Sequence, residues 1–146
     1  MTNILYTIGS NRKSARELFD LLKENHIEKI IDIRLSNTSQ LAGFTKKNDF
    51  EYFLKEIADI KYIYEKDFAP TKELMAEKRE KKITMSEFES EFSKILEQRR
   101  AENIFKESEL NRACLLCSEE NASECHRRVI TKYLKKKYMK LEIVDL

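Results

Sequence analysis

The stretch RACLLCSEENASECHRR, from Arg112 to Arg128, predicts a short apolar strand, a polar loop and the start of a helix. The strand covers Ala113 to Leu116, and the helix begins near Arg127. A helix start leaves its first N–H groups without partners and carries partial positive charge, so it stabilises a nearby anion or thiolate. We therefore expect the chemistry of this protein at the junction of strand, loop and helix.

The candidate catalytic residues of this junction are a set of thiol, carboxylate, imidazole and guanidinium groups: Cys117, Glu119, Cys125, His126 and Arg127. A thiol titrates at roughly pH 8.5, and nearby cations lower that value and expose the nucleophilic thiolate. Cys114 lies within the apolar strand and is expected to be a core residue. Cys117 has both a packing and a reactive interpretation, and the sequence does not decide whether Cys117 or Cys125 reacts.

Composition limits the class of protein. The chain has 146 residues, which predicts one domain over 1–146, and its 28 Lys and Arg nearly cancel its 26 Asp and Glu. That balance favours neither a nucleic-acid coat nor a membrane surface. The basic residues gather between Arg127 and Lys140, where they form either a solvated face or a face that meets phosphates.

The apolar runs and the cysteines of the sequence predict where the protein is located and whether it holds a disulfide or a metal ion. No signal peptide and no membrane-spanning run is visible, so we expect a cytoplasmic protein with no membrane partner. Three cysteines in a reducing compartment make a disulfide framework improbable. Cys114 and Cys117 form a CxxC, but residues three apart on a strand face opposite sides, so no metal site is expected.

Strand and helix patterns alternate along the chain, which predicts an α/β fold: a three-layer Rossmann-like domain with a mainly parallel sheet of about five strands flanked by helices. The expected strands are 3–8, 27–33, 61–64, 113–116 and 141–144; the expected helices are 15–22, 49–57, one starting at Pro70 and Thr71, 86–100 and 127–138. Only Gly9 and Gly43 are glycines, which excludes a P-loop and a dinucleotide-binding turn, and no cofactor is expected.

Ligands of open parallel sheets bind outside the carboxyl ends of the strands. The residues predicted to bind substrate there are Gly9, Ser10, Asn11, Asp32 and Arg34, which share this edge with Cys117. For Asp32 and Arg34 the alternative is a structural ion pair, because both side chains fall on the same face of the sheet. The polar loop 37–45 is expected to be a lid or a substrate-contact loop.

Several segments resemble one known family, the domain of unknown function 488 family. They are YTIGSN (6–11), IDIR (31–34), NTSQLAGFTKK (37–47), APTKEL (69–74) and LLCSEENASECHR (115–127), so the resemblance spans the chain. It implies a fold similar to the rhodanese and Cys-dependent phosphatase superfamily, whose active-site loop follows a central strand. The activity of the family is not established, but the broader grouping is associated with sugar, nucleotide or nucleic-acid phosphates.

Carried over onto this chain, the family motif falls on eight residues: Gly9, Asp32, Arg34, Cys117, Glu119, Cys125, His126 and Arg127. Ser10 and Tyr64 stand where many relatives carry a histidine, which questions any mechanism that needs an imidazole from the amino-terminal half. The phosphatase spacing Cys-x5-Arg is also absent, so a tight phosphatase-type cradle is not implied.

The sequence therefore favours an enzyme that acts on a phosphorylated sugar, nucleotide or nucleic-acid end. Its partners would be a phosphorylated small molecule or a nucleic-acid end, and the oligomeric state stays open. One alternative is a noncatalytic nucleotide or nucleic-acid binding module that uses Arg127 and the basic last helix. A second, a rhodanese-like thiotransferase, follows from fold analogy alone.

Overall fold

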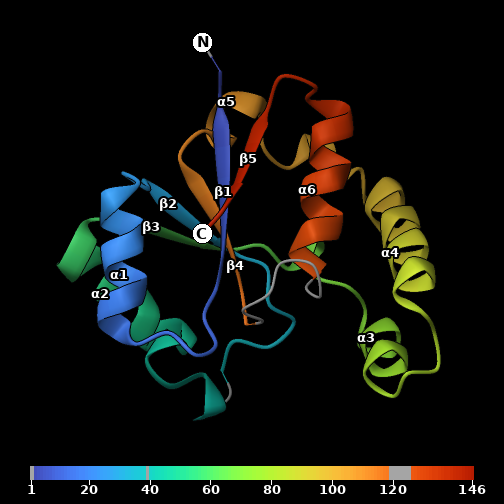
Figure 1. The fold of residues 1–146 in the computed structure, drawn as a ribbon, viewed down its shortest axis with the longest axis horizontal. Coiled ribbons are helices and arrows are strands. Elements are labelled where there is room, and N and C mark those ends of the chain that lie inside the picture. The colour runs from blue at the N-terminus through green and yellow to red at the C-terminus, as the bar shows by residue number, and fades with distance from the viewer. Residues whose placement is uncertain (1, 39, 119–125) are drawn as a thin grey trace.

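The computed structural model describes residues 2–38, 40–118 and 126–146. Strands and helices alternate in it as the sequence pattern predicts (Figure 1). The strands are β1 (Ile4–Gly9), β2 (Lys29–Asp32), β3 (Lys61–Tyr64), β4 (Ala113–Cys117) and β5 (Glu142–Asp145). The α-helices are α1 (Ala15–Glu24), α2 (Lys47–Ala58), α3 (Lys72–Arg79), α4 (Met85–Arg99), α5 (Glu107–Leu110) and α6 (His126–Lys137). Three short 3₁₀ helices join them: η1 (Gln40–Thr45), η2 (Lys66–Phe68) and η3 (Ala101–Asn103).

The five strands form one sheet in the order β3-β2-β4-β1-β5, and every neighbouring pair is parallel. β4 lies in the middle of the sheet, and all its residues from Ala113 to Cys117 are buried. A strand covered on both faces has this continuous apolar sequence, whereas the edge strand β5 is mostly exposed. The prediction of an α/β domain with a parallel sheet of about five strands is confirmed.

Helices cover the two faces of the sheet and produce three layers (Figure 1). On one face α1 and α2 bury Leu18, Leu22 and Phe50 against the sheet. On the other face α4 and α6 bury aromatic and aliphatic side chains, among them Phe88 and Phe92. The aromatic residues of the helix predicted over 86–100 therefore belong to the core, as their helical spacing predicts.

The pleat of β4 sends neighbouring side chains to opposite faces. Cys114 packs with the α1 and α2 residues, whereas Cys117 packs with those of α4 and α6. The prediction that these two thiols face opposite sides of the sheet is confirmed, and so is the core position of Cys114, whose side chain is fully buried.

Some boundaries differ from the prediction. Strand pairing of β2 covers only residues 29–32, because only these residues pair with both β3 and β4. The loop predicted over 37–45 contains η1. The helix expected to start at Asp49 begins at Lys47, and the charged helix α3 ends at Arg79, before a turn in which Lys81 has a φ of 58°.

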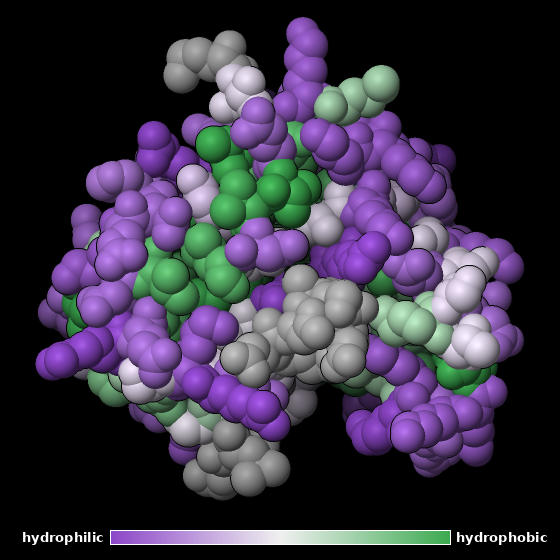
Figure 2. Space-filling view, viewed as in Figure 1, coloured by the Kyte–Doolittle hydropathy of each residue, from purple (hydrophilic) through white to green (hydrophobic). Residues whose placement is uncertain are grey.

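The face drawn in Figure 2 is mainly hydrophilic, with apolar surface over β1 and β5. Val144 of β5 is 38% exposed, and Met139, just before this strand, is 81% exposed. No helix in the described part of the chain is both long enough and apolar enough to cross a membrane.

Helix starts are fixed by side-chain caps. The hydroxyls of Ser14 and Thr84 each accept a hydrogen bond from the backbone N–H three residues later. In turn, the carboxylates of Glu17 and Glu87 accept hydrogen bonds from the backbone N–H groups of these two caps. These capping boxes satisfy N–H groups that a helix start otherwise leaves open. Thr71, predicted at a helix start, caps α3 through the N–H of Leu74.

Removing the cap of α4 tests this part of the fold. Thr84→Ala is expected to lower the free energy of unfolding by about 1 kcal/mol, because the N–H of Glu87 loses its acceptor. Chemical denaturation measures the change. Thr84→Ser keeps the hydroxyl and is the matched control, so an equal loss in both variants would contradict a capping role.

Candidate functional site

The chain leaves β1 and β4 toward opposite faces of the sheet. α1 follows β1 and joins the layer with α2, whereas α6 follows β4 and joins the layer with α4. Adjacent strands whose connections diverge in this way mark the place where open parallel sheets bind ligands. The candidate site therefore lies at the carboxyl end of β4.

The loop after β1 lies beside the end of β4. Gly9 is the register partner of Cys117, and the backbone N–H of Ser10 donates to the carbonyl of Cys117 at 2.9 Å. The N–H of Asn11 donates to the carbonyl of Ser118 at 2.8 Å. Three of the residues predicted to bind substrate, Gly9, Ser10 and Asn11, are thus brought to the start of the loop that follows β4.

Asp32 and Arg34 form the ion pair that the sequence offered as an alternative. Nη2 of Arg34 lies 2.8 Å from Oδ2 of Asp32, and Nε lies 2.9 Å from Oδ1. Both side chains are buried, with 0% and 3% of their surface exposed. The same carboxylate accepts hydrogen bonds from the hydroxyl of Tyr62 and the amide of Asn37. Its acceptor capacity is therefore used within the protein.

This ion pair anchors the loop between β2 and α2. The guanidinium of Arg34 donates to the hydroxyl of Thr45 at 3.1 Å and to its carbonyl at 2.7 Å. The carbonyl of Asn37 accepts the N–H of Lys47 at 2.8 Å. Both ends of the loop predicted as a lid are thus bonded to the protein interior. Burial, followed by the hydrogen bond to Asp32, raises the pKa of Tyr62.

Sequence reasoning missed Asn37, Thr45 and Tyr62 as members of this network. A visible signal was the alternation of β3, which places Tyr62 and Tyr64 on the same face. Tyr64 stands where the resemblance implies a histidine, and its hydroxyl donates to the carbonyl of Leu35 at 3.2 Å. It therefore holds the same loop.

His126 is the first residue of α6 and is buried, with 5% of its surface exposed. Its Nε2 lies 2.7 Å from the carbonyl oxygen of Ile33, and its ring lies 6.0 Å from that of Phe92. Because a carbonyl only accepts, Nε2 carries the proton in this contact. Burial lowers the pKa of His126 to about 4, so the imidazole is neutral at pH 7.

Arg127 is also buried, with 1% of its surface exposed, and lies in the first turn of α6. Its charge lowers the pKa of the imidazole of His126, whereas the charge of Asp32 raises it. The charged groups of the β2 end and of the α6 start therefore act on one another. Lys13, after β1, donates to the carbonyl of Gly9 at 2.8 Å and adds a cation at this edge.

The two described cysteines differ in state. Cys114 is a free thiol, and its burial raises its pKa, which makes it unreactive at neutral pH. Cys117 is 1% exposed and is disulfide-bonded. The sequence made a disulfide framework improbable and did not predict this bond, because an odd number of cysteines does not prevent one pair from forming. The predicted site residues Glu119 and Cys125 lie outside the described residues.

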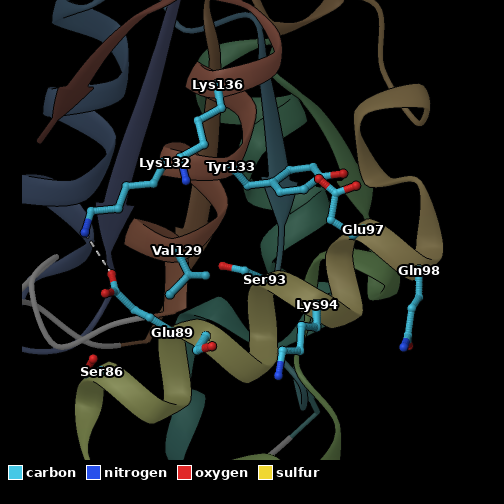
Figure 3. A pocket seen from close by; sticks show the side chains of 11 residues that line it. Ser86, Glu89, Ser93, Lys94, Glu97, Gln98, Val129, Lys132, Tyr133 and Lys136 are labelled. Atoms are coloured by element: carbon cyan, nitrogen blue, oxygen red, sulfur yellow. Dashed lines mark hydrogen bonds and ion pairs between the residues drawn. The ribbon is translucent and has the colours of Figure 1, made fainter.

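The basic run of the last helix is partly neutralised by α4. Nζ of Lys132 lies 3.0 Å from Oε1 of Glu89, and Nζ of Lys137 lies 2.9 Å from Oε1 of Glu97. A groove of about 750 Å³ lies between α4 and α6 (Figure 3). Lys132, Glu89 and Glu97 line it. None of the described site residues lines this groove. The contacts favour the interpretation of the basic run as a solvated, ion-paired face.

Among residues 2–38, 40–118 and 126–146, no group of three or more His, Cys, Asp and Glu side chains is arranged to hold a metal ion.

Residues 14–134 match the model of a family described as domain of unknown function DUF488. No curated protein and no solved structure matches the chain. The matched range contains β2, β3 and β4, the buried Asp32–Arg34 pair and the start of α6. The resemblance read from the sequence motifs is confirmed, and the chain belongs to the DUF488 family.

Proposed function

We propose that this protein is an enzyme that acts on a phosphorylated sugar, nucleotide or nucleic-acid end at the carboxyl ends of β1, β2 and β4. The observation that carries the proposal is the buried guanidinium of Arg127 in the first turn of the helix that follows the central strand. A guanidinium at this place can bind a phosphate group as a planar, permanently charged donor. A helix start adds partial positive charge, and the two together favour a phosphate group.

The proposed binding roles differ between the two arginines. Arg127 holds the phosphate through charge-assisted hydrogen bonds. Arg34 acts through the loop that it anchors, because its guanidinium is bonded to Asp32 and Thr45. The loop after β1, with Gly9, Ser10 and Asn11, supplies a backbone wall on the other side of β4.

The proposed reaction begins with a thiolate from Cys117 or Cys125. It attacks phosphorus and forms an S–P bond while the P–O bond to the leaving group breaks. Glu119 gives a proton to the leaving oxygen, and water then hydrolyses the S–P bond. His126 donates from Nε2 to Ile33, so its proposed role is to fix the start of α6. A pKa of about 4 makes its imidazole a weak base, which leaves the acid–base role to Glu119. For Cys117, the disulfide must first be reduced by a thiol.

The test is turnover of phosphomonoesters by the full chain with and without dithiothreitol. 4-Nitrophenyl phosphate, a hexose phosphate, a nucleoside monophosphate and a 5′-phosphorylated oligonucleotide serve as probes. We expect phosphate release only from reduced protein, and a loss of at least about a hundredfold in kcat for Cys117→Ser or Arg127→Lys. Cys114→Ala, at the buried free thiol, is the matched control and should keep activity. Full activity of Cys117→Ser, Cys125→Ser and Arg127→Lys would overturn the proposal.

A noncatalytic module is the competing class, and the same protein distinguishes it. Such a module would bind a phosphorylated ligand without turnover, with an affinity that falls steeply as salt rises. Lys132 and Lys137 of the basic last helix form ion pairs with carboxylates of α4, which makes this helix a poor candidate for the main phosphate contact. Binding without any turnover would favour the module over the enzyme.

A further inference from the structure

β3 is an edge strand of the sheet, and in the described part of the chain it pairs with β2 alone. Neighbouring residues of a strand direct their backbone groups to opposite sides, so a strand bonds its neighbour through every second residue. Along β3 and directly after it, the N–H groups of Lys61 and Glu65 donate toward β2 at 3.1 and 3.0 Å. The backbone groups of Tyr62 and Tyr64 therefore point outward, away from the sheet.

The outer side of β3 is open to a further strand. Natural edge strands are commonly protected by proline, by a bulge or by a covering segment. β3 contains no proline, and its residues match those of β2 one to one, which leaves no bulge. A hollow of about 500 Å³ lies beside it, lined by Lys61 and Tyr62 together with Glu51 and Lys55 of α2. No hydrogen bond between described residues engages the outward backbone groups of Tyr62 and Tyr64.

The side chains of this edge are complementary to themselves in one antiparallel register. Lys61, Ile63 and Glu65 alternate along the chain and so lie on one face of the sheet. If two copies of β3 run antiparallel with Ile63 opposite Ile63, Lys61 of each copy lies opposite Glu65 of the other. Tyr62 then lies opposite Tyr64, and the outward backbone groups of each such pair exchange hydrogen bonds in both directions. Opposite charges, aromatic pairs and a β-branched pair directly across two strands all stabilise a sheet.

Other pairings of the edges do not combine these features. A shift of two residues places Lys61 opposite Ile63, and a shift of one residue sets outward backbone groups against inward ones. Charged residues at an edge oppose such mismatched pairings, so they select the register in which opposite charges meet. The other edge strand, β5, offers no such match, because pairing it with itself about the exposed Val144 places Glu142 opposite Leu146.

We propose that two copies of this chain associate through β3, in an antiparallel pairing centred on Ile63 that continues the sheet from one copy into the other. The pairing has two-fold symmetry, so each contact occurs twice. Within the described residues neither Lys61 nor Glu65 forms an ion pair, and both charges are available to the second copy. The carboxyl ends of the two sheets then point in opposite directions, which keeps both candidate sites accessible. The inference does not depend on the proposed function.

Sedimentation equilibrium of the full chain, from micromolar to millimolar concentration, tests the proposal. The wild type should show a reversible equilibrium between monomer and dimer. Lys61→Glu sets like charges opposite each other at both ends of the pairing and should weaken the dimer by at least about tenfold. Glu142→Lys, an equally exposed charge reversal on β5, is the matched control and should change the dissociation constant by less than about twofold.

Exchanging the two charges identifies the register. The double variant Lys61→Glu with Glu65→Lys restores opposite charges across the two strands and should dimerise within about threefold of the wild type. Mixing the Lys61→Glu protein with the Glu65→Lys protein should likewise give a mixed dimer, because each then carries the charge that the other lacks. Circular dichroism of every variant confirms its fold, since the Glu65 carboxylate also accepts the N–H of Asp67 at 3.3 Å.

Amide hydrogen exchange locates the contact without a substitution. The N–H groups of Tyr62 and Tyr64 should exchange rapidly in dilute protein and slowly where the dimer predominates. The N–H of Ile63 faces β2 and should be protected at both concentrations, which makes it the internal control.

Three results would overturn the inference: a monomer up to millimolar concentration, a dimer that Lys61→Glu leaves unchanged, and a dimer whose formation leaves the exchange of Tyr62 and Tyr64 unaltered. A dimer that Glu142→Lys disrupts and Lys61→Glu does not would place the contact at β5 and would also overturn it.

Discussion

Asp32→Asn is expected to destabilise the fold by about 3–5 kcal/mol, because it leaves the guanidinium of Arg34 charged and buried without its counter-ion. The amide of the variant has one oxygen, so it cannot accept both parallel bonds from Arg34. Its NH₂ group would face N–H groups that donate to the carboxylate in the wild type. The loss in the free energy of unfolding can be measured by urea denaturation monitored by circular dichroism.

Two variants show whether the charge or the network is responsible. Tyr62→Phe removes one neutral donor to the same carboxylate and should cost only about 1–2 kcal/mol. Asp32→Leu combined with Arg34→Met removes both charges and should be less destabilised than Asp32→Asn alone, since no buried charge is left over. A double variant as unstable as the sum of its single variants would contradict a coupled ion pair.

The fold could be predicted from the sequence to the extent that one local pattern determined each element. The apolar run of β4 and the helix start at Thr71 were recognised because burial on both faces and a hydroxyl before a helix leave direct traces in the sequence. The start of α2 was missed because Lys46 stands at its N-cap without a side-chain cap. The short helix η1 was missed since no periodic pattern marks a single 3₁₀ segment.

The candidate site was predictable where strand parity sufficed. Parity placed Asp32 and Arg34 on one face, and the parallel arrangement placed Gly9 at the same edge of the sheet as Cys117. That β1 and β4 are neighbours was not predicted. Parity could not show that the guanidinium of Arg34 would donate hydrogen bonds to Thr45, because that contact depends on how the loop 35–46 returns to the sheet. Tertiary contacts of this kind leave no periodic signal.

Acid should unfold this protein at a higher pH than protonation of its carboxylates alone would, because His126 is buried in its neutral form. Its pKa is lowered to about 4 in the folded protein from 6.5 in the unfolded chain, mainly by burial. Above pH 6.5 the ring is neutral in both states, and between pH 6.5 and 4 the unfolded chain binds a proton that the folded chain does not. Stability is therefore present above pH 6.5 and is lost as the pH falls toward 4, by about 3 kcal/mol in total and about 2 kcal/mol by pH 5.

His126→Gln isolates this contribution, since a glutamine amide can donate to the carbonyl of Ile33 without titrating. Urea denaturation at pH 7.5 and pH 5 should show a loss of stability that is about 2 kcal/mol smaller in His126→Gln than in the wild type. His26→Asn is the matched control: His26 is the exposed second histidine and has a φ of 54°, which asparagine tolerates. That variant should keep the pH dependence of the wild type. If His126→Gln keeps it as well, the imidazole is not held neutral by burial in the folded protein.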